Sequence, residues 1–177
     1  MTNKRVVVTG LSINTRLGDT LDGFLEALYA GRSGITRWEV FPTDRVYSKV
    51  GGDLSSYDWK AKLAGLEGVI PSEVFRRLRK LVPRAAWTTK LSMLLAVDAW
   101  IDAGLFTAEL DRDATSIIVS GHNLNALYHY ETRARFEEEP DFIDGMTSLY
   151  SLDTDHAGSV SEALQTRGAI FTVWGAC

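Results

Sequence analysis

The sequence predicts an α/β fold, with helices layered on a largely parallel sheet. Three short, mostly apolar runs, at residues 5–10, 116–121 and 170–174, end at or just before a glycine. Runs of this kind are typical of strands buried on both faces of a parallel sheet. Stretches with the apolar spacing of helices separate the runs, and such alternation indicates a parallel sheet with helices packed against it.

The first helix follows the run at 5–10. Asp19 or Thr20 is placed to cap its start, because short polar side chains accept hydrogen bonds from the first free N–H groups. Gly31 is placed to end it, since glycine readily takes the left-handed conformation. The apolar positions that share one helix face are Leu21, Phe24, Leu25, Leu28 and Tyr29.

Residues 32–72 are rich in loop-forming glycine and proline, with a short strand expected at 46–50. A basic stretch at 75–84 follows, and a long helix is expected after it, capped by Thr88 or Thr89 and closed by Gly104. The apolar face of this helix is made of Met93, Ala96, Val97, Trp100 and Ile101.

The remaining helices are expected at 128–138, before an acidic patch at 137–144, and at 159–166. Gly168 is placed to stop the last helix before the strand at 170–174. We find no internal repeat and no linker, so we expect the chain to form one domain, or one half of a pseudo-symmetric domain.

Composition narrows the possible functions. The chain has 177 residues and a net charge of −4, which argues against general affinity for nucleic acid. No apolar run is long enough to span a membrane, and the first residues lack the pattern of a signal peptide. A single cysteine excludes an internal disulfide and fits a reducing cytoplasm. We therefore expect a cytoplasmic protein without nucleic-acid or membrane partners.

The single cysteine, Cys177, is the candidate nucleophile. It follows the apolar run at 170–174 and a Gly-Ala turn, so a strand would deliver its thiol onto a sharp turn. The thiolate is the reactive form, and a helix N-terminus or a protonated histidine lowers the pKa that controls it. The sequence lacks a helix after Cys177. The alternative is that the residue is a small, buried, inert side chain.

The histidines and the acidic residues near the last helix carry weaker signals. His122, His129 and His156 are each more often structural than catalytic, although His122 follows a strand end, where ligand sites of open sheets gather. The run from Asp153 to His156 matches no standard metal spacing. We expect no metal there, and we expect Asp153 or Asp155 to cap the last helix.

A cluster of basic residues stands out in this acidic protein. It could dock an acidic partner or a phosphate group, or form an ordinary solvated helix face. The strand ends at Gly10 and Gly121 belong to no nucleotide-binding glycine motif. The cluster consists of Arg76, Arg77, Arg79, Lys80 and Arg84.

Five segments, in order, resemble the first half of the β-ketoacyl synthases, the condensing enzymes of fatty acid and polyketide assembly. The run 5–11 resembles the family's "VVVTG" strand, and 24–35 its helix ending in "AGxSGI". Residues 102–105 match "DAGL", and 116–121 resemble the strand ending in "GSG". The segment 162–177 resembles the stretch that delivers the active-site cysteine.

This resemblance implies a thiolase-like fold of five layers, α-β-α-β-α, built from two similar halves and usually dimeric. Residues 1–177 would form the N-terminal half, and a second polypeptide or segment would supply the rest, including the two His and the Lys of the family. Cys177 would accept an acyl group as a thioester, and a carrier-bound malonyl unit would lose CO2 and condense with it. No cofactor is implied beyond the phosphopantetheine carried by an acyl carrier protein, which the basic cluster would dock.

The sequence also departs from the family pattern. Trp174 and Gly175 stand where small or hydroxyl residues are usual, so Trp174 is expected to shape the acyl pocket or to pack at a dimer seam. Segments 122–125 and 150–156 also differ from the family, which suggests a divergent member of a polyketide pathway. Two alternatives remain open: a malonyl-carrier decarboxylase, and a non-catalytic partner resembling a chain-length factor.

Overall fold

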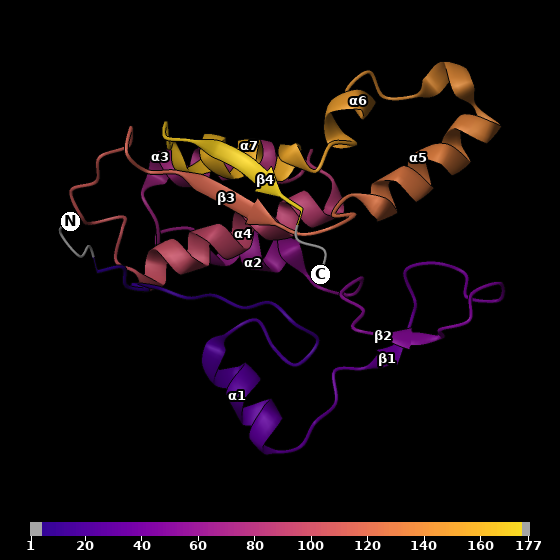
Figure 1. Cartoon of the computed structure of the whole chain (residues 1–177), viewed down its shortest axis with the longest axis horizontal. Helices are drawn as coiled ribbons and strands as arrows, with labels where there is room; N and C mark the ends of the chain where they lie inside the picture. Colours follow the sequence, from indigo (N-terminus) through magenta and orange to yellow (C-terminus); the bar gives the residue numbers. More distant parts are fainter. Residues whose placement is uncertain (1–4, 175–177) are drawn as a thin grey trace.

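The computed structural model describes residues 5–174, and Cys177 lies outside the described residues. Figure 1 shows a group of packed helices with a small sheet on one side, and two peripheral parts that extend away from it. The elements in chain order are α1 (Leu21–Tyr29), β1 (Thr36–Arg37), β2 (Val50–Gly51), α2 (Trp59–Gly65), α3 (Ser72–Leu81), α4 (Trp87–Asp102), β3 (Ile117–Ser120), α5 (Ala126–Glu138), the 3-10 helix η1 (Pro140–Phe142), α6 (Thr147–Tyr150), α7 (Thr154–Leu164) and β4 (Ile170–Val173).

The hydrophobic core lies among α2, α3, α4 and α7, which we call the helical body. Helix α4 packs against α7 and α2, and α3 packs against α7. The predicted apolar face of α4 is confirmed for Met93, Val97 and Trp100, which are buried, whereas Ile101 is exposed at the helix end. The core residues are Leu63, Leu66, Ile70, Val74, Leu78, Val82, Met93, Leu94, Val97, Trp100, Val160, Ala163 and Leu164.

The parallel sheet is confirmed, although it is small in the described chain. Strands β3 and β4 pair in parallel from Ile117 opposite Ile170 to Ser120 opposite Val173. Helix α7 packs on both strands and covers one face (Figure 1). The prediction that these strands are buried on both faces is wrong for residues 5–174, because Ile118 on the open face is 59% exposed. No described segment covers that face.

The run at 5–10 is not a strand in the described structure, which corrects the sequence-based prediction. No described strand lies beside it, and Val6 is 92% exposed. A β-branched run needs a neighbouring strand before it can form a ladder. The residues that follow it are held to α4 instead, since the Leu11 N–H donates to Asp102 at 2.8 Å and the Ser12 hydroxyl donates to the Leu95 carbonyl at 2.8 Å.

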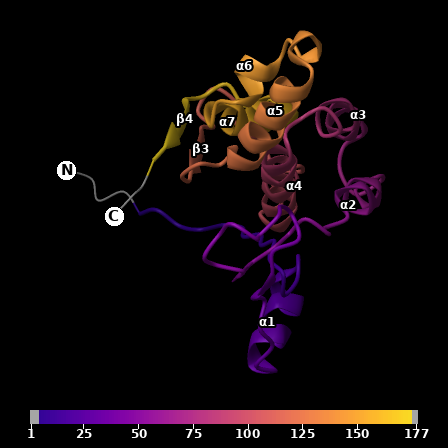
Figure 2. The same ribbon diagram turned by 90° about the vertical axis from the view of Figure 1, so that its right-hand side faces the viewer.

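Helix α1 forms as predicted. The Thr20 hydroxyl accepts a hydrogen bond from the Gly23 N–H, so Thr20 rather than Asp19 is the cap. Gly31 has φ +67°, the left-handed conformation expected after the last turn. Figures 1 and 2 both show α1 apart from the helical body. The strand expected at 46–50 is shorter and later, because only residues 50–51 pair with β1.

Three helix ends differ from the sequence-based predictions. Helix α4 begins after Ala86 without a side-chain cap, and the predicted caps Thr88 and Thr89 lie inside its first turn, where their hydroxyl groups donate to Asn125 and Asp155. Helix α7 begins at Thr154, five residues earlier than expected. It ends at Gln165, which itself takes the left-handed conformation at φ +57°, so Gly168 is not the stop.

Residues 126–152, comprising α5, η1 and α6, form an arm that extends from the helical body (Figure 1). None of the residues within its three helices is buried. Contacts inside the arm include a Tyr128–Tyr150 edge-to-face pair at 6.0 Å between ring centroids. The arm carries exposed aromatic and apolar side chains, namely Tyr130, Phe136, Phe142, Met146, Leu149 and Leu152.

Candidate functional site

The ends of β3 and β4 define the candidate site. Because the strands are parallel and in register, both carboxyl ends lie at the same edge of the sheet. The Gly121 N–H donates to the Val173 carbonyl at 3.3 Å, so the loop after β3 starts beside the end of β4. Trp174, three residues before Cys177, is 70% exposed there. The predicted nucleophile itself lies outside the described residues.

The loop at 121–125 turns sharply at this edge. A Cβ on Gly121 would lie 2.3 Å from Cδ2 of Leu124, so glycine permits the close approach of that side chain. Asn123 takes a left-handed conformation, with φ +54°, which asparagine tolerates better than most residues. His122 is exposed on this loop. It follows the end of β3, as predicted.

A buried polar network lies at the base of this loop. His156 and Asn125 are each 1% exposed, and His156 Nε2 is 3.0 Å from Asn125 Oδ1. His156 Nδ1 is 2.8 Å from the Ser92 hydroxyl. Burial lowers the pKa of His156, and the nearby Asp153 carboxylate opposes this. Sequence reasoning treated His156 as one of three weak candidates and did not identify Asn125, because their partners lie far away along the chain.

The acidic residues near α7 do not cap the helix with their side chains, which corrects the prediction. Asp153 occupies the N-cap position, yet its side chain makes no cap bond to α7. Its Oδ1 accepts from the Asn125 N–H at 3.3 Å. Asp155 accepts from Thr89 at 3.1 Å and from Ser159 at 3.3 Å, and burial raises its pKa. Capping by Asp155 is therefore wrong, since this carboxylate lies inside the first turn.

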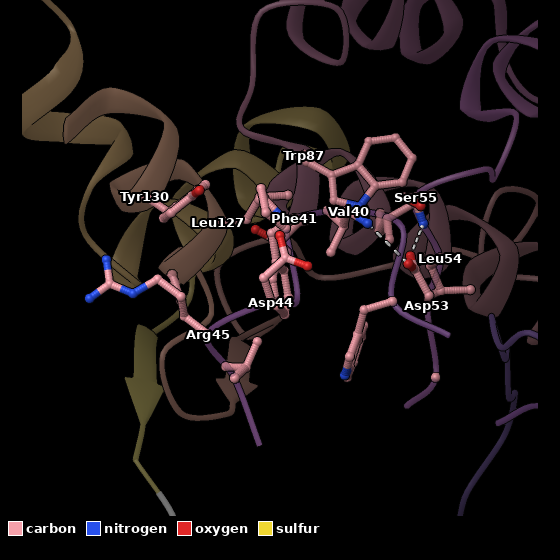
Figure 3. A pocket seen from close by; sticks show the side chains of 17 residues that line it. Val40, Phe41, Asp44, Arg45, Asp53, Leu54, Ser55, Trp87, Leu127 and Tyr130 are labelled. Atoms are coloured by element: carbon pink, nitrogen blue, oxygen red, sulfur yellow. Dashed lines mark hydrogen bonds between the residues drawn. The ribbon is translucent and has the colours of Figure 1, made fainter. Parts of the chain in front are cut away.

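A cavity of about 850 Å³ lies between α4, the start of the arm and the loops around β1 and β2. Figure 3 shows Leu127 and Tyr130 on one side of it and Trp87 and Ser55 on the other. Most of its lining is apolar, as expected for a cavity that holds an apolar group. The apolar and aromatic lining residues include Trp38, Val40, Phe41, Leu54, Trp87, Leu91, Leu127 and Tyr130.

Asp53 fixes one wall of this cavity. Burial by itself raises the pKa of this carboxyl group, but backbone N–H groups of Glu39, Ser55 and Val40 outweigh it and hold the pKa at about 2. The Glu39 N–H lies 2.6 Å from Oδ2. Figure 3 shows the bonds from the Val40 N–H to Oδ2, at 3.2 Å, and from the Ser55 N–H to Oδ1, at 2.7 Å. With these bonds made, Asp53 organises the loop rather than acting as an acid or base.

The predicted basic cluster lies on and just after α3. Arg76, Arg79, Lys80 and Arg84 are exposed, as docking would require. Arg77 is half-buried, and its Nε donates to the Ala163 carbonyl at 3.3 Å, so it ties α3 to α7. The acyl-pocket role of Trp174 and the docking role of the cluster stay predictions.

Two further findings concern the described residues as a whole. Between residues 5 and 174, no group of three or more His, Cys, Asp or Glu side chains is arranged to hold a metal ion. Within the same range, no helix combines the length and apolar character that crossing a bilayer requires.

The helices packed on a parallel strand pair, with the loop 121–125 at the carboxyl ends of the strands, define an α/β protein with a candidate site at that edge of the sheet. Residues 3–177 match the model of the β-ketoacyl synthase N-terminal domain, and the chain belongs to this family.

Relatives support the same family. The chain is 22% identical over 171 residues to a polyketide biosynthesis malonyl-ACP decarboxylase of Bacillus subtilis, covering 97% of this chain and 37% of that protein. It is 26% identical over 179 residues to 3-oxoacyl-[acyl-carrier-protein] synthase 1 of Haemophilus influenzae, and the match covers 98% of this chain and 40% of that protein. The chain thus spans about two fifths of these relatives.

Solved structures confirm the thiolase-like fold. The ishigamide ketosynthase/chain length factor superposes with a TM-score of 0.70 at 18% identity, covering 97% of this chain and 40% of that one. A β-ketoacyl synthase from Burkholderia phymatum superposes with a TM-score of 0.64 at 20% identity, and the match covers 96% of this chain and 38% of that one. This agreement establishes the fold of the chain.

Proposed function

We propose that this chain provides the nucleophile-bearing part of a carrier-dependent condensing enzyme. The observation that carries the proposal is the in-register parallel pair β3–β4, because β4 ends at Val173, four residues before Cys177, at the sheet edge where the loop 121–125 begins. Family membership supports it, since the matched region extends to residue 177. Groups outside this chain complete the reaction.

The proposed chemistry has two steps. The Cys177 thiolate attacks the carbonyl carbon of an acyl thioester, and the carrier thiol leaves as the acyl group passes to sulfur. A carrier-bound malonyl unit then loses CO2, and the resulting carbanion attacks the acyl-cysteine. The new carbon–carbon bond forms as the carbon–sulfur bond breaks, which returns the thiolate. The Cys177 N–H is one proposed donor to the developing oxyanion.

The proposed partner is an acyl carrier protein, whose phosphopantetheine arm would bring both substrates. The exposed side chains Arg76, Arg79, Lys80 and Arg84 form the proposed docking surface, because a basic surface attracts an acidic partner and speeds its association. A second polypeptide or segment would supply the remaining catalytic residues, in a dimeric or heteromeric assembly.

A malonyl-carrier decarboxylase is the alternative that a relative favours, because the Bacillus subtilis protein carries that name and aligns over 97% of this chain. A non-catalytic partner of a ketosynthase is the third candidate, since one superposed structure is a ketosynthase/chain length factor. The presence of Cys177 favours condensation over both, because neither needs a thiol that accepts an acyl group.

The test combines the full chain with its completing polypeptide, an acyl thioester and a malonyl-carrier protein, followed by intact mass spectrometry. Condensation predicts one acyl group on the chain, none on the C177A variant, and a β-ketoacyl carrier as product. Acetyl-carrier formation that C177A retains would identify a decarboxylase instead. If the chain takes up no acyl group and no product forms, the result supports the non-catalytic role.

The docking surface has its own test. Charge reversal by R79E and K80E is expected to raise the KM for the carrier at least tenfold while kcat changes little, because docking precedes the chemical step. R135E, which reverses an exposed charge on α5, is the matched control. Equal effects of the two changes would contradict docking at α3.

A further inference from the structure

The two ends of the arm meet at one buried side chain. Asn125 directly precedes α5, and its Nδ2 donates at 3.0 Å to the carbonyl of Leu152, the last residue of the arm. Its backbone N–H donates to Asp153 at 3.3 Å. His129 Nε2 lies 2.9 Å from the Ser151 carbonyl, which adds a second link between the two ends. The arm is therefore closed at its base.

Asn125 and Asp153 both occupy N-cap positions, yet neither caps its own helix through its side chain. Asparagine and aspartate are strongly favoured at this position because they normally satisfy free N–H groups of the first turn. Here both side chains turn toward the base of the arm. This network therefore replaces two ordinary cap bonds.

The hydrogen bonds around Asn125 determine which ring nitrogen of neutral His156 carries the hydrogen. With its amide nitrogen directed to Leu152, the Asn125 Oδ1 atom faces the Thr88 hydroxyl at 3.0 Å and His156 Nε2 at 3.0 Å. An amide oxygen only accepts, so Nε2 must carry the hydrogen. In the neutral ring Nδ1 is then bare and accepts from the Ser92 hydroxyl. Every polar atom of the ring is satisfied without a charge.

We propose that Ser92, Asn125 and His156 form an acid-sensitive clasp, which fixes the base of the arm to the helical body while the His156 ring is neutral and releases it when the ring is protonated. A second proton would lie on Nδ1, where Ser92 now donates, and would place a charge in a site that is 1% exposed. The cost of a buried charge without a full counter-ion favours opening instead.

The charged groups around the ring set the direction of the pH dependence. Asp153, at the N-cap of α7, is the charged group that acts on the ring, whereas the Asp155 carboxylate is bonded to Thr89 and Ser159. The contacts from α4 and from the residue before α5 are the neutral Ser92, Thr88 and Asn125. Burial lowers the pKa of His156 from its usual 6.5, and Asp153 only partly opposes this. The clasp is therefore fully formed above about pH 6.5 and weakens as the pH falls below it.

Opening would also change the cavity, because the first turns of the arm form one of its walls. Ala126, Leu127 and Tyr130 line the cavity from α5, and Trp87 and Leu91 line it from α4. Figure 3 shows Leu127 and Tyr130 on the side opposite Trp87. Asn125 immediately precedes the first of these lining residues. Release of the clasp is expected to move this wall and to admit solvent to the apolar surface of α4.

The test is hydrogen–deuterium exchange of the full chain between pH 7.5 and pH 5, corrected for the intrinsic pH dependence of exchange. The clasp predicts that opening of the arm rises about tenfold per pH unit below 6.5, while the amides of α4 keep their protection. Exchange that is flat with pH, or equal acceleration of arm and α4, would overturn the proposal.

Two variants separate the clasp from a general effect of acid. In H156Q the amide can donate to Asn125 and accept from Ser92 without titrating, so the arm is expected to stay protected at pH 5. H129Q, at the second link between the arm ends, is expected to keep the wild-type pH dependence. A pH response that survives in H156Q would contradict the proposal. An NMR titration of His156 in the wild-type chain must give a midpoint below 6.5 that coincides with arm opening.

Discussion

The helical body and the periphery of this protein bury their apolar residues to very different degrees. In the body, side chains from α2, α3, α4 and α7 interlock, and Leu78, Val82 and Val97 are fully buried. In the N-terminal segment and the arm, residues of equal hydrophobicity, such as Val6 and Phe136, are exposed. Similar sequence patterns thus give a core where a partner surface lies within the described chain, and an open surface where it does not.

The largest expected effect comes from truncating the core. L78A removes a fully buried side chain at the centre of the helical body and is expected to cost about 2–5 kcal/mol of unfolding free energy. V6A, in the exposed segment, is expected to change it by less than about 0.5 kcal/mol. Denaturant titration measures both. A comparable loss in V6A would mean that the periphery is packed as tightly as the body.

Asp53 tests whether a peripheral loop can be held by polar bonds alone. D53N removes a carboxylate that accepts three backbone N–H bonds and is expected to cost about 1.5–3 kcal/mol. Because the folded pKa is about 2, below the usual 3.8, this stability is present above pH 4 and is lost as the pH falls toward 2. D44N, at an exposed residue of the same cavity, should be neutral in the same unfolding titration.

Gly10 tests the contact between the N-terminal segment and helix α4 of the helical body. A Cβ there would lie 2.6 Å from both the Ala99 carbonyl oxygen and the Ala103 nitrogen of α4 and its C-cap. G10A is expected to cost about 1–3 kcal/mol, because backbone atoms cannot move aside as a flexible side chain does. G65A, where a Cβ meets nothing within 4 Å, is the control. Thermal unfolding that shows no difference between them would place the N-terminal segment off α4.

The smallest expected effect on stability comes from removing an ion pair, and two pairs in different surroundings can be compared. Lys62 and Asp98 pair at 2.7 Å between α2 and α4 with about four fifths of each side chain buried, whereas Arg133 and Glu137 pair at 3.0 Å on the exposed arm. K62M is expected to cost about 1 kcal/mol at pH 7. Burial already raises the pKa of Asp98, and Lys62 opposes this, so the cost should shrink in acid as Asp98 takes a proton. R133A should have no measurable effect on denaturant midpoints.

Local patterns in the sequence predicted the elements whose stability is mainly local. The apolar spacing of α1, its Thr20 cap and the positive φ of Gly31 could all be identified from neighbours in the chain. The buried face of α4 was also predictable, because a helix of this length must turn one apolar face inward. The parallel pairing of β3 and β4 followed from the alternation of strands and helices.

What the sequence by itself determined is thus the fold class, the family and the identity of the candidate nucleophile, since these follow from periodicity and from residues in order. Only the tertiary structure decided that the run at 5–10 lacks a strand partner, that Gln165 rather than Gly168 ends α7, and that Thr88, Asn125 and His156 meet. The physical reason is the separation along the sequence between the interacting residues. A cap or a helix face depends on residues within one or two turns of each other. A buried hydrogen-bond network joins groups 31 and 64 residues apart, whose meeting only packing can arrange.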